Sequence, residues 1–149
     1  MIEAVSQNNL HEVLTLIADY QQFYRAPDIC PQKNAAFFAQ FSQHSPLGCQ
    51  FAFRKQAKVI GFATVLFSYS SSLAAKVAVL NDLYIVPEQR NKGYARQLIK
   101  HCQLFAQSNS AVRLQWLTAQ DNHRAQRLYD SLAVTKSAWY FYALAASDA

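Results

Sequence analysis

The sequence predicts an α/β fold in which one mixed β-sheet carries helices on both faces. Segments rich in aromatic and β-branched residues alternate with segments whose apolar residues recur at helical spacing. Their order is β-α-α-β-β-β-α-β-α-β, with the last strand segment open to division into two. Consecutive strands in the first half favour antiparallel pairing, and the strand–helix–strand order of the second half favours a parallel crossover.

The N-terminal part is expected to hold a short strand and two helices. Residues 2–5 have strand character. Over residues 10–24 the apolar side chains form a helical stripe, with Asn9 as its cap and Pro27 beyond its end. A weaker helix at residues 34–43 carries three phenylalanines and ends before a Ser-Pro-Leu-Gly break.

Three strands are expected in the middle of the chain. Residues 49–54 and 59–67 are aromatic and β-branched, and the polar residues 55–58 between them predict a hairpin. A third, longer strand at residues 74–86 ends at Pro87, because proline cannot continue a strand ladder and keeps the residue before it extended.

The C-terminal part alternates helices with strands. Residues 93–107 place their apolar side chains on one face of a helix, and residues 112–117 read as a short apolar strand. A further helix is expected at residues 122–132. The aromatic residues 134–144 predict closing strand material.

Length and composition agree with a single domain over residues 1–149. A chain of 149 residues that is 52% hydrophobic can bury one core and is not disordered. No apolar run reaches the ~18–20 residues that cross a bilayer, and no secretory signal opens the sequence, so we expect a cytoplasmic protein with no membrane partner. Three widely spaced cysteines without a Cys/His cluster predict neither disulfides nor a metal site.

Basic residues concentrate where the expected long strand gives way to a helix. Within eleven residues the chain places Arg90, Lys92, Arg96 and Lys100. The first N–H groups of a helix lack intrahelical partners and carry the positive end of its dipole, and small residues at Gly93 and Ala95 let a diphosphate approach them. The segment therefore predicts an anion site, with a solvated loop and an ordinary tight turn as the alternative.

A second strand-to-helix crossing occurs at Asn122. Two consecutive crossings of this kind place both helix starts at the same edge of the sheet. Asn122 can cap its helix, and Tyr129 lies seven residues on, two turns along the same face. A tyrosine at that position is expected to look back towards the strand ends.

In these two segments the chain resembles the GCN5-related N-acetyltransferase (GNAT) superfamily. Arg90-Asn91-Lys92-Gly93-Tyr94-Ala95 fits that family's (Q/R)-x-x-G-x-(G/A) acetyl-CoA loop, and Asn122-x-x-Ala125-x-x-Leu128-Tyr129 fits its second signature. The early Tyr20-Gln21-Gln22-Phe23-Tyr24 and the run from Asn81 to Glu88 are similar to the small-amine branch, which includes diamine and polyamine acetyltransferases.

The resemblance implies an acetyl-CoA-dependent N-acetyltransferase that acts on a small primary amine, with acetyl-CoA as cosubstrate and no metal. It also implies that the end of the strand at residues 83–86 supplies backbone hydrogen bonds to the pantetheine and the thioester carbonyl, with Ile85 and Val86 as the natural donors. The residues implied in cosubstrate binding are Leu83, Tyr84, Ile85, Val86, Arg90, Asn91, Lys92, Gly93, Tyr94, Ala95, Arg96 and Asn122.

Acetyl transfer needs a deprotonated amine and a protonated leaving thiolate. Tyr129 is the candidate general acid, against a plain packing role. Asp82 is the candidate that binds the ammonium group or passes its proton through water, against a carboxylate that only faces solvent. His101 and His123 are candidate bases by residue type alone.

Two departures from the family pattern stand out. The family often has a Gly-Phe pair where this chain has Ala133 and Val134, which puts the end of the last helix in doubt. The small-amine branch often has a carboxylate where this chain has Asn81, which puts polyamine specificity in doubt.

Other functions stay open at this level. The acceptor can be a protein N-terminus or lysine, and a non-catalytic acyl-CoA sensor would keep the basic loop without needing Tyr129. A nucleic-acid binder ranks last, since the pI of 9.2 comes without a recognition-helix or stacking pattern. The aromatic cluster at residues 139–142 fits either an acceptor pocket or a homodimer interface.

Overall fold

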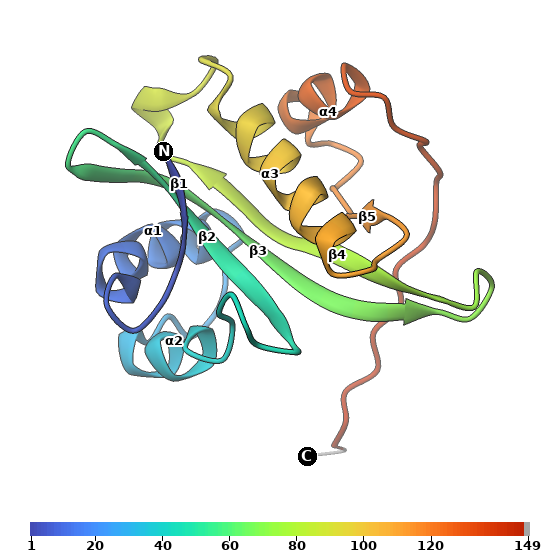
Figure 1. Ribbon diagram of the computed structural model, residues 1–149, viewed down its shortest axis with the longest axis horizontal. Coiled ribbons are helices and arrows are strands. Elements are labelled where there is room, and N and C mark those ends of the chain that lie inside the picture. The colour runs from blue at the N-terminus through green and yellow to red at the C-terminus, as the bar shows by residue number, and fades with distance from the viewer. Residues whose placement is uncertain (148–149) are drawn as a thin grey trace. The chain divides into compact units, whose positions relative to one another are not determined.

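The computed structural model describes residues 1–147 and divides the chain into two compact bodies, Met1–Trp116 and Leu117–Ala149. The first body contains the β-sheet and three α-helices (Figure 1). The second contains one α-helix and an extended C-terminal segment.

The sheet of the first body has five strands in the order β1-β2-β3-β4-β5. The first three pairings are antiparallel, and β4 pairs with β5 in parallel. The mixed sheet with a late parallel crossover is therefore confirmed. The strands are β1 (Ile2–Ala4), β2 (Gly48–Lys55), β3 (Lys58–Ser70), β4 (Ala75–Ile85) and β5 (Leu114–Gln115).

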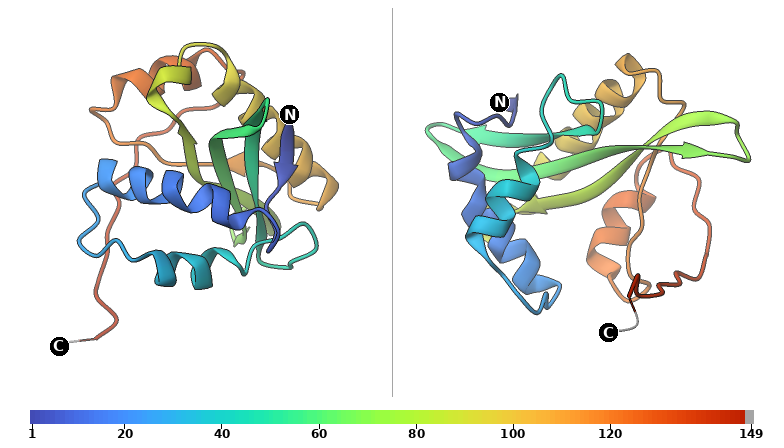
Figure 2. Two further views of the ribbon diagram at one scale, coloured as in Figure 1. Left: turned by 90° about the vertical axis from the view of Figure 1, so that its left-hand side faces the viewer. Right: turned by 90° about the horizontal axis from the view of Figure 1, so that it is seen from below.

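Helices cover both faces of this sheet, as the sequence predicts. Figure 2 shows α1 and α2 on one face and α3 on the other. The helices are α1 (Leu10–Phe23), α2 (Pro31–Phe38) and α3 (Tyr94–Ser108). The α2 helix begins earlier than the expected residue 34, because Pro31 fits the first helical turn, where its missing N–H costs nothing. It also ends earlier than expected, at Phe38.

Asn9 occupies the cap position of α1, but its side chain does not cap the helix. Its Oδ1 accepts the backbone N–H of Ser6 at 2.7 Å, and its Nδ2 donates to the carbonyl of Ala4 at 3.2 Å. The side chain therefore fastens the turn between β1 and α1.

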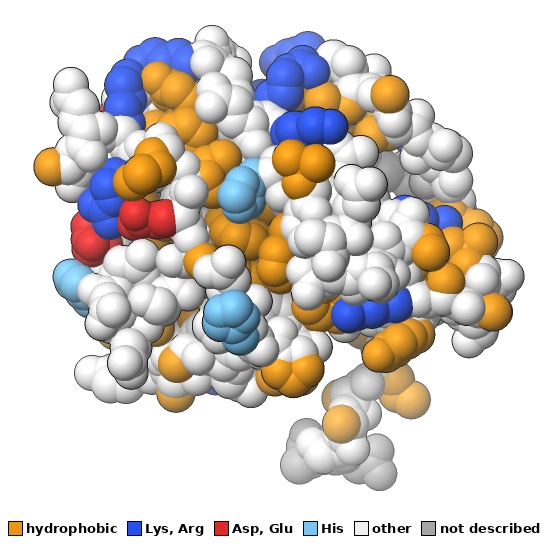
Figure 3. All heavy atoms as spheres, viewed as in Figure 1, with side chains coloured by type: hydrophobic (Ala, Val, Ile, Leu, Met, Phe, Trp, Pro, Cys, Tyr) orange, Lys and Arg blue, Asp and Glu red, His pale blue; other side chains and the backbone are white. Residues whose placement is uncertain are grey.

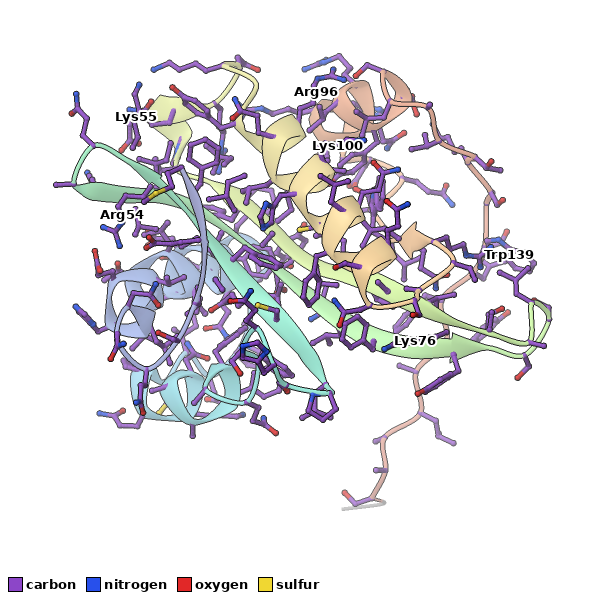
Figure 4. All side chains as sticks on the ribbon, in the orientation of Figure 1. Arg54, Lys55, Lys76, Arg96, Lys100 and Trp139 are labelled. Atoms are coloured by element: carbon purple, nitrogen blue, oxygen red, sulfur yellow. The ribbon has the colours of Figure 1, made fainter. Side chains whose placement is uncertain are left out.

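Arg54 at the end of β2 ties α1 to the sheet (Figure 4). Its Nη2 lies 2.7 Å from Glu3 Oε1 on β1, and its Nη1 lies 2.8 Å from Glu12 Oε2 on α1. The hydrogen bond from Arg54 lowers the pKa of Glu12, so the pair persists below the ordinary titration range of a glutamate. The Arg54–Glu12 pair therefore holds α1, the helix that carries Tyr20, against the sheet.

The second body begins its helix where the sequence predicts and lacks the strand that the sequence predicts. Helix α4 spans His123–Asp130. Residues 134–144 form no strand, which corrects the expected closing strand, and the side chains of Trp139 to Tyr142 are 80–89% exposed. An aromatic pattern favours a strand only where a neighbouring strand takes up its N–H and C=O groups, and within residues 1–147 no strand pairs with this segment.

Leu98 tests how much the α3 side of the core contributes to stability. The Leu98 side chain is fully buried on the apolar face of α3, as the sequence predicts. Leu98→Ala is expected to lower the free energy of unfolding by about 2–5 kcal/mol, because it removes buried methyl groups and leaves a cavity. Urea denaturation checks this value, and the neighbouring exposed residue gives the control Gln97→Ala, which should change stability by under ~0.5 kcal/mol. Equal stability of the two variants would contradict the assignment.

Candidate functional site

Asp82 lies in a distorted part of β4. Its register partner is Thr64 on β3, and the next pair is Val65 with Leu80, so Asn81 is the extra residue of a β-bulge. The Asp82 side chain is only 7% exposed, and its Oδ2 atom is buried without a hydrogen-bond partner. The expectation of a carboxylate that merely faces solvent is therefore wrong.

Burial raises the pKa of Asp82 above that of an ordinary aspartate. Hydrogen bonds from the side chains of Thr64, Tyr20 and Asn81 act in the opposite direction, since they stabilise the charged form, but desolvation is the larger effect. A carboxyl with a raised pKa is a stronger base than a solvated one. Asp82 is thus suited to take a proton.

Tyr20, a hydrogen-bond partner of this carboxyl, belongs to an aromatic cluster from α1, β3 and β4. The Tyr20 ring packs edge-on against Phe62 at 5.7 Å and against Tyr84 at 6.3 Å between centroids, and Tyr24 lies 4.8 Å from Tyr20. Burial, and secondarily the Asp82 charge, raise the pKa of the Tyr24 hydroxyl. The sequence placed Asp82 and Tyr84 on one face of the strand, and the shared contacts with α1 confirm this.

The end of β4 determines which backbone donors are available. The Val86 N–H donates to Ile60 O on β3 at 2.9 Å, so Val86 is not the free amide donor that the family resemblance implied. Because successive amides of a strand point to opposite sides, the Ile85 N–H faces away from β3. The Ile85 carbonyl on that same side accepts the Nε–H of Arg90 at 2.7 Å. Ile85 therefore remains the donor candidate.

Arg90 and Lys92 are held by the protein itself. The Arg90 guanidinium lies over the Tyr84 ring at 5.3 Å, in addition to its bond to Ile85 O. The Lys92 ammonium donates to Glu88 O and to Gln89 Oε1, each at 3.2 Å. Glu88 and Gln89 belong to the short 3₁₀ helix η1 (Pro87–Gln89), which the sequence did not predict. Arg90 and Lys92 lie in the loop that follows it. Arg90 therefore helps to build the end of β4 besides adding positive charge.

The loop enters α3 through two residues in the left-handed region. Asn91 has φ of 62° and Gly93 has φ of 85°, and Gly93 is the residue that precedes the helix. No protein atom lies within 4 Å of the position that a Cβ on Gly93 would occupy. Open space thus lies over the N-terminus of α3, where Tyr94 and Ala95 present first-turn amides. Lys and Arg side chains gather along this edge of the molecule (Figure 3).

Helix α4 in the second body carries the other two predicted site residues. The Asn122 Oδ1 accepts the Ala125 N–H at 3.3 Å, which confirms Asn122 as the cap. Tyr129 lies half-buried near the other end of α4. Its role towards a thioester stays a prediction, as does the part of Asn122 in cosubstrate binding.

Other reactive side chains serve the core. The His101 ring packs edge-on against Phe51 at 4.6 Å, and burial lowers its pKa. Burial raises the pKa of the fully buried Cys102 thiol to about 12, so this cysteine does not act as a nucleophile. Within residues 1–147 no three His, Cys, Asp or Glu residues cluster in a way that would hold a metal ion. None of the helices described is long and apolar enough to cross a membrane.

Gln50 and Thr64, which lie in register with Asp82 across the sheet, were not predicted from the sequence. Both are completely buried polar side chains among the apolar buried residues of β2 and β3, and they lie on the same face of the sheet as Asp82. A polar residue inside an apolar run was the available signal. The pairing register that joins them to Asp82 could not be read from any one strand.

Comparison with known proteins matches residues 12–133 to the acetyltransferase (GNAT) family. An uncharacterized N-acetyltransferase of Bacillus subtilis, YhfO, is 27% identical over 118 residues, which cover 79% of this chain and 78% of that protein. The D-amino-acid N-acetyltransferase HPA3 of Saccharomyces cerevisiae is 38% identical over 50% of this chain and 46% of its own. A thialysine N-epsilon-acetyltransferase of Caenorhabditis elegans is 36% identical over 51% of this chain and 50% of its own.

Solved structures share the fold over nearly the whole chain. A probable acetyltransferase superposes with a TM-score of 0.84 at 25% identity, covering 99% of both chains. The aminoglycoside N-acetyltransferase AAC(6')-Iy, solved in complex with CoA, gives a TM-score of 0.82 at 17% identity over 99% of this chain and 95% of its own.

Proposed function

Because this chain belongs to the acetyltransferase (GNAT) family and is an N-acetyltransferase, we propose that it moves the acetyl group of acetyl-CoA to the primary amine of a small molecule. The observation that carries the proposal is Asp82, a buried carboxyl with one unpartnered oxygen beside an aromatic cluster. It lies three residues before Ile85, whose amide faces away from β3. We further propose that residues 1–149 act as one N-acetyltransferase domain.

The reaction that these residues would support is a direct transfer. Acetyl-CoA supplies an activated acetyl group as a thioester. Asp82 takes the proton from the acceptor ammonium, directly or through water, which frees the nitrogen lone pair for attack on the carbonyl carbon. The Ile85 N–H polarises the carbonyl oxygen. When the carbon–sulfur bond breaks, Tyr129 gives its proton to the departing thiolate. The second proton, which the acetylated nitrogen loses, restores the Tyr129 hydroxyl through water, and Asp82 releases its proton to solvent.

The loop at residues 90–95 would hold the pyrophosphate of acetyl-CoA. Open space over Gly93, first-turn amides of α3 and nearby basic side chains all fit an anion of this kind. A helix N-terminus reached through glycine lets the phosphate oxygens approach the backbone N–H groups closely. The residues present therefore fit the cosubstrate.

Gly93→Val is expected to weaken CoA binding by roughly 10- to 100-fold. The valine side chain would fill the space that the phosphates need, and about one hydrogen bond between a phosphate oxygen and a backbone N–H of α3 would be lost. Isothermal titration calorimetry with CoA measures the change. Valine also strains a backbone with φ of 85°. The control is therefore Gly93→Asn, since asparagine tolerates this conformation and still fills the space. Unchanged CoA affinity in both folded variants would refute the pyrophosphate site.

The acceptor class is supported by the relatives named above, which are described as acting on D-amino acids and thialysine. A panel of polyamines, amino acids, aminoglycosides and peptides, assayed for CoA release with the purified protein, tests the proposal. Turnover of a small amine above all peptides is the expected result. Turnover of peptides alone would favour a protein N-acetyltransferase, and CoA binding without any turnover would favour a sensor.

We also propose a cytoplasmic homodimer. All three cysteines are unpaired, as is usual in a reducing compartment. Trp139, Tyr140, Phe141 and Tyr142 are 80–89% exposed, and contiguous aromatic surface of this kind is typical of protein interfaces. Analytical ultracentrifugation should give twice the mass of the chain, and replacing Trp139 and Phe141 with serine should give the monomer mass.

A further inference from the structure

A row of three polar side chains crosses the sheet beneath α1. Gln50 on β2 pairs in register with Thr64 on β3, and Thr64 pairs in register with Asp82 on β4. Their exposed fractions are 0%, 0% and 7%. Register partners point to the same face of a sheet, and Asp82 interacts with Tyr20, so the row lies on the α1 face.

Hydrogen bonds connect the three side chains in order, from Gln50 through Thr64 to Asp82. The Gln50 Nε2 donates to Thr64 Oγ1 at 3.1 Å. This bond uses an acceptor position of the threonine hydroxyl, so the hydroxyl hydrogen is available to Asp82, with which Thr64 is hydrogen-bonded. The Asp82 Oδ2 and the Gln50 Oε1 are left as buried atoms without partners. The carboxyl is thus held by Thr64, with Tyr20 and Asn81 as its other partners, while Oδ2 is unpartnered.

Stability alone does not explain such a row. Buried polar groups without partners are costly, and apolar side chains of the same shape would pack this face at least as well. The neighbours of the row on the same face include the apolar Ala52 and Phe62, both buried. Two buried polar residues aligned on one carboxyl therefore point to a requirement of the reaction.

We propose that Thr64 and Gln50 are positioning residues of the acetyl transfer, which hold the buried Asp82 carboxyl in the orientation from which it takes the proton of the acceptor amine, directly or through water. This inference rests on the proposed function, because it assumes that Asp82 is the base. Gln50 orients the Thr64 hydroxyl, and Thr64 orients the carboxyl. Neither residue exchanges a proton with the substrate.

The charged and titratable groups around Asp82 lie on two elements. Helix α1 contributes Tyr20 and Tyr24, and β4 contributes Tyr84, whose own pKa is raised by burial and by Asp19. Because a hydroxyl bonded to a carboxylate stabilises its charged form, loss of the Thr64 hydroxyl should raise the pKa of Asp82 further. The base would then lose its proton only at higher pH.

Thr64→Val is expected to move the acid limb of the kcat/KM profile upwards by about one pH unit, which is about a tenfold loss on the acid side. Thr64→Ser should restore the limb, since it keeps the hydroxyl. The exposed Thr15 on α1 gives the control Thr15→Val, which should leave the profile unchanged. Carbon-13 NMR of labelled aspartate, assigned with Asp82→Asn, follows the carboxyl titration directly.

The two measurements separate the inference from the function it rests on. A parallel upward shift of the carboxyl titration and of the rate limb in Thr64→Val, reversed in Thr64→Ser, supports the inference. Unchanged titration and rate limb in folded Thr64→Val would overturn it while leaving Asp82 as the base. A shifted titration without any shift of the rate limb would overturn both, because the carboxyl would then not be the base.

Discussion

Asp82→Asn is expected to lower kcat/KM by roughly 10²–10⁴-fold and to abolish the acid limb of its pH profile. Asparagine keeps the size of the side chain and one acceptor oxygen, so the bond from Thr64 can survive. It cannot take a proton. The buried carboxyl, with its raised pKa, is the group whose protonation should stop the reaction as the pH falls.

Asp82→Asn should lose activity without losing folding stability. The pKa of Asp82 is raised in the folded protein, so the folded state binds its proton more tightly than the unfolded chain does. The aspartate therefore reduces stability as the pH rises through its unfolded pKa, and a neutral asparagine avoids this loss. Thermal unfolding at neutral pH should show Asp82→Asn to be at least as stable as the wild type.

The exposed Asp28 supplies the control Asp28→Asn, which changes the net charge equally and should leave the rate profile unaltered. A wild-type kcat/KM for Asp82→Asn across the pH range would show that Asp82 only packs. A stable variant that has lost activity would instead separate catalysis from folding.

Local patterns were enough to predict the order of elements. Helical stripes, β-branched runs and the breaks at Pro27 and Pro87 are properties of short segments, and the structure has an element at each predicted position up to α4. The cap at Asn122 followed from its residue type and its place before a helix. The side chain of Asn9 had a nearer partner in the Ser6 amide, so the same rule failed there.

The features that could not be predicted from the sequence depend on how the β-strands pair with one another. The bulge at Asn81 sets which side chains of β4 face α1, and the partner of Val86 depends on the register with Ile60. The alignment of Gln50 with Thr64 and Asp82 is likewise a property of three strands together. The segment at residues 134–144 has strand composition without a strand partner, so composition alone misassigned it.

Tyr129→Phe is expected to lower kcat by roughly 10²–10⁴-fold while acetyl-CoA affinity changes little. Phenylalanine keeps the ring, so the packing of the half-buried side chain on α4 is preserved. Only the hydroxyl that would protonate the leaving sulfur is lost. A smaller loss would mean that water replaces it, since a thiolate with a pKa near ~8.5 is already a tolerable leaving group.

The pH profile makes this prediction specific to a proton donor. A phenolic acid must remain protonated, so wild-type turnover should decline on the alkaline side, and Tyr129→Phe should lose that decline. Asn122→Ala is the matched control on the same helix, because it removes the cap bond to Ala125 and should weaken cosubstrate binding while keeping the alkaline limb. If Tyr129→Phe turns over at the wild-type rate at every pH, Tyr129 serves packing alone and the acid is water or another residue.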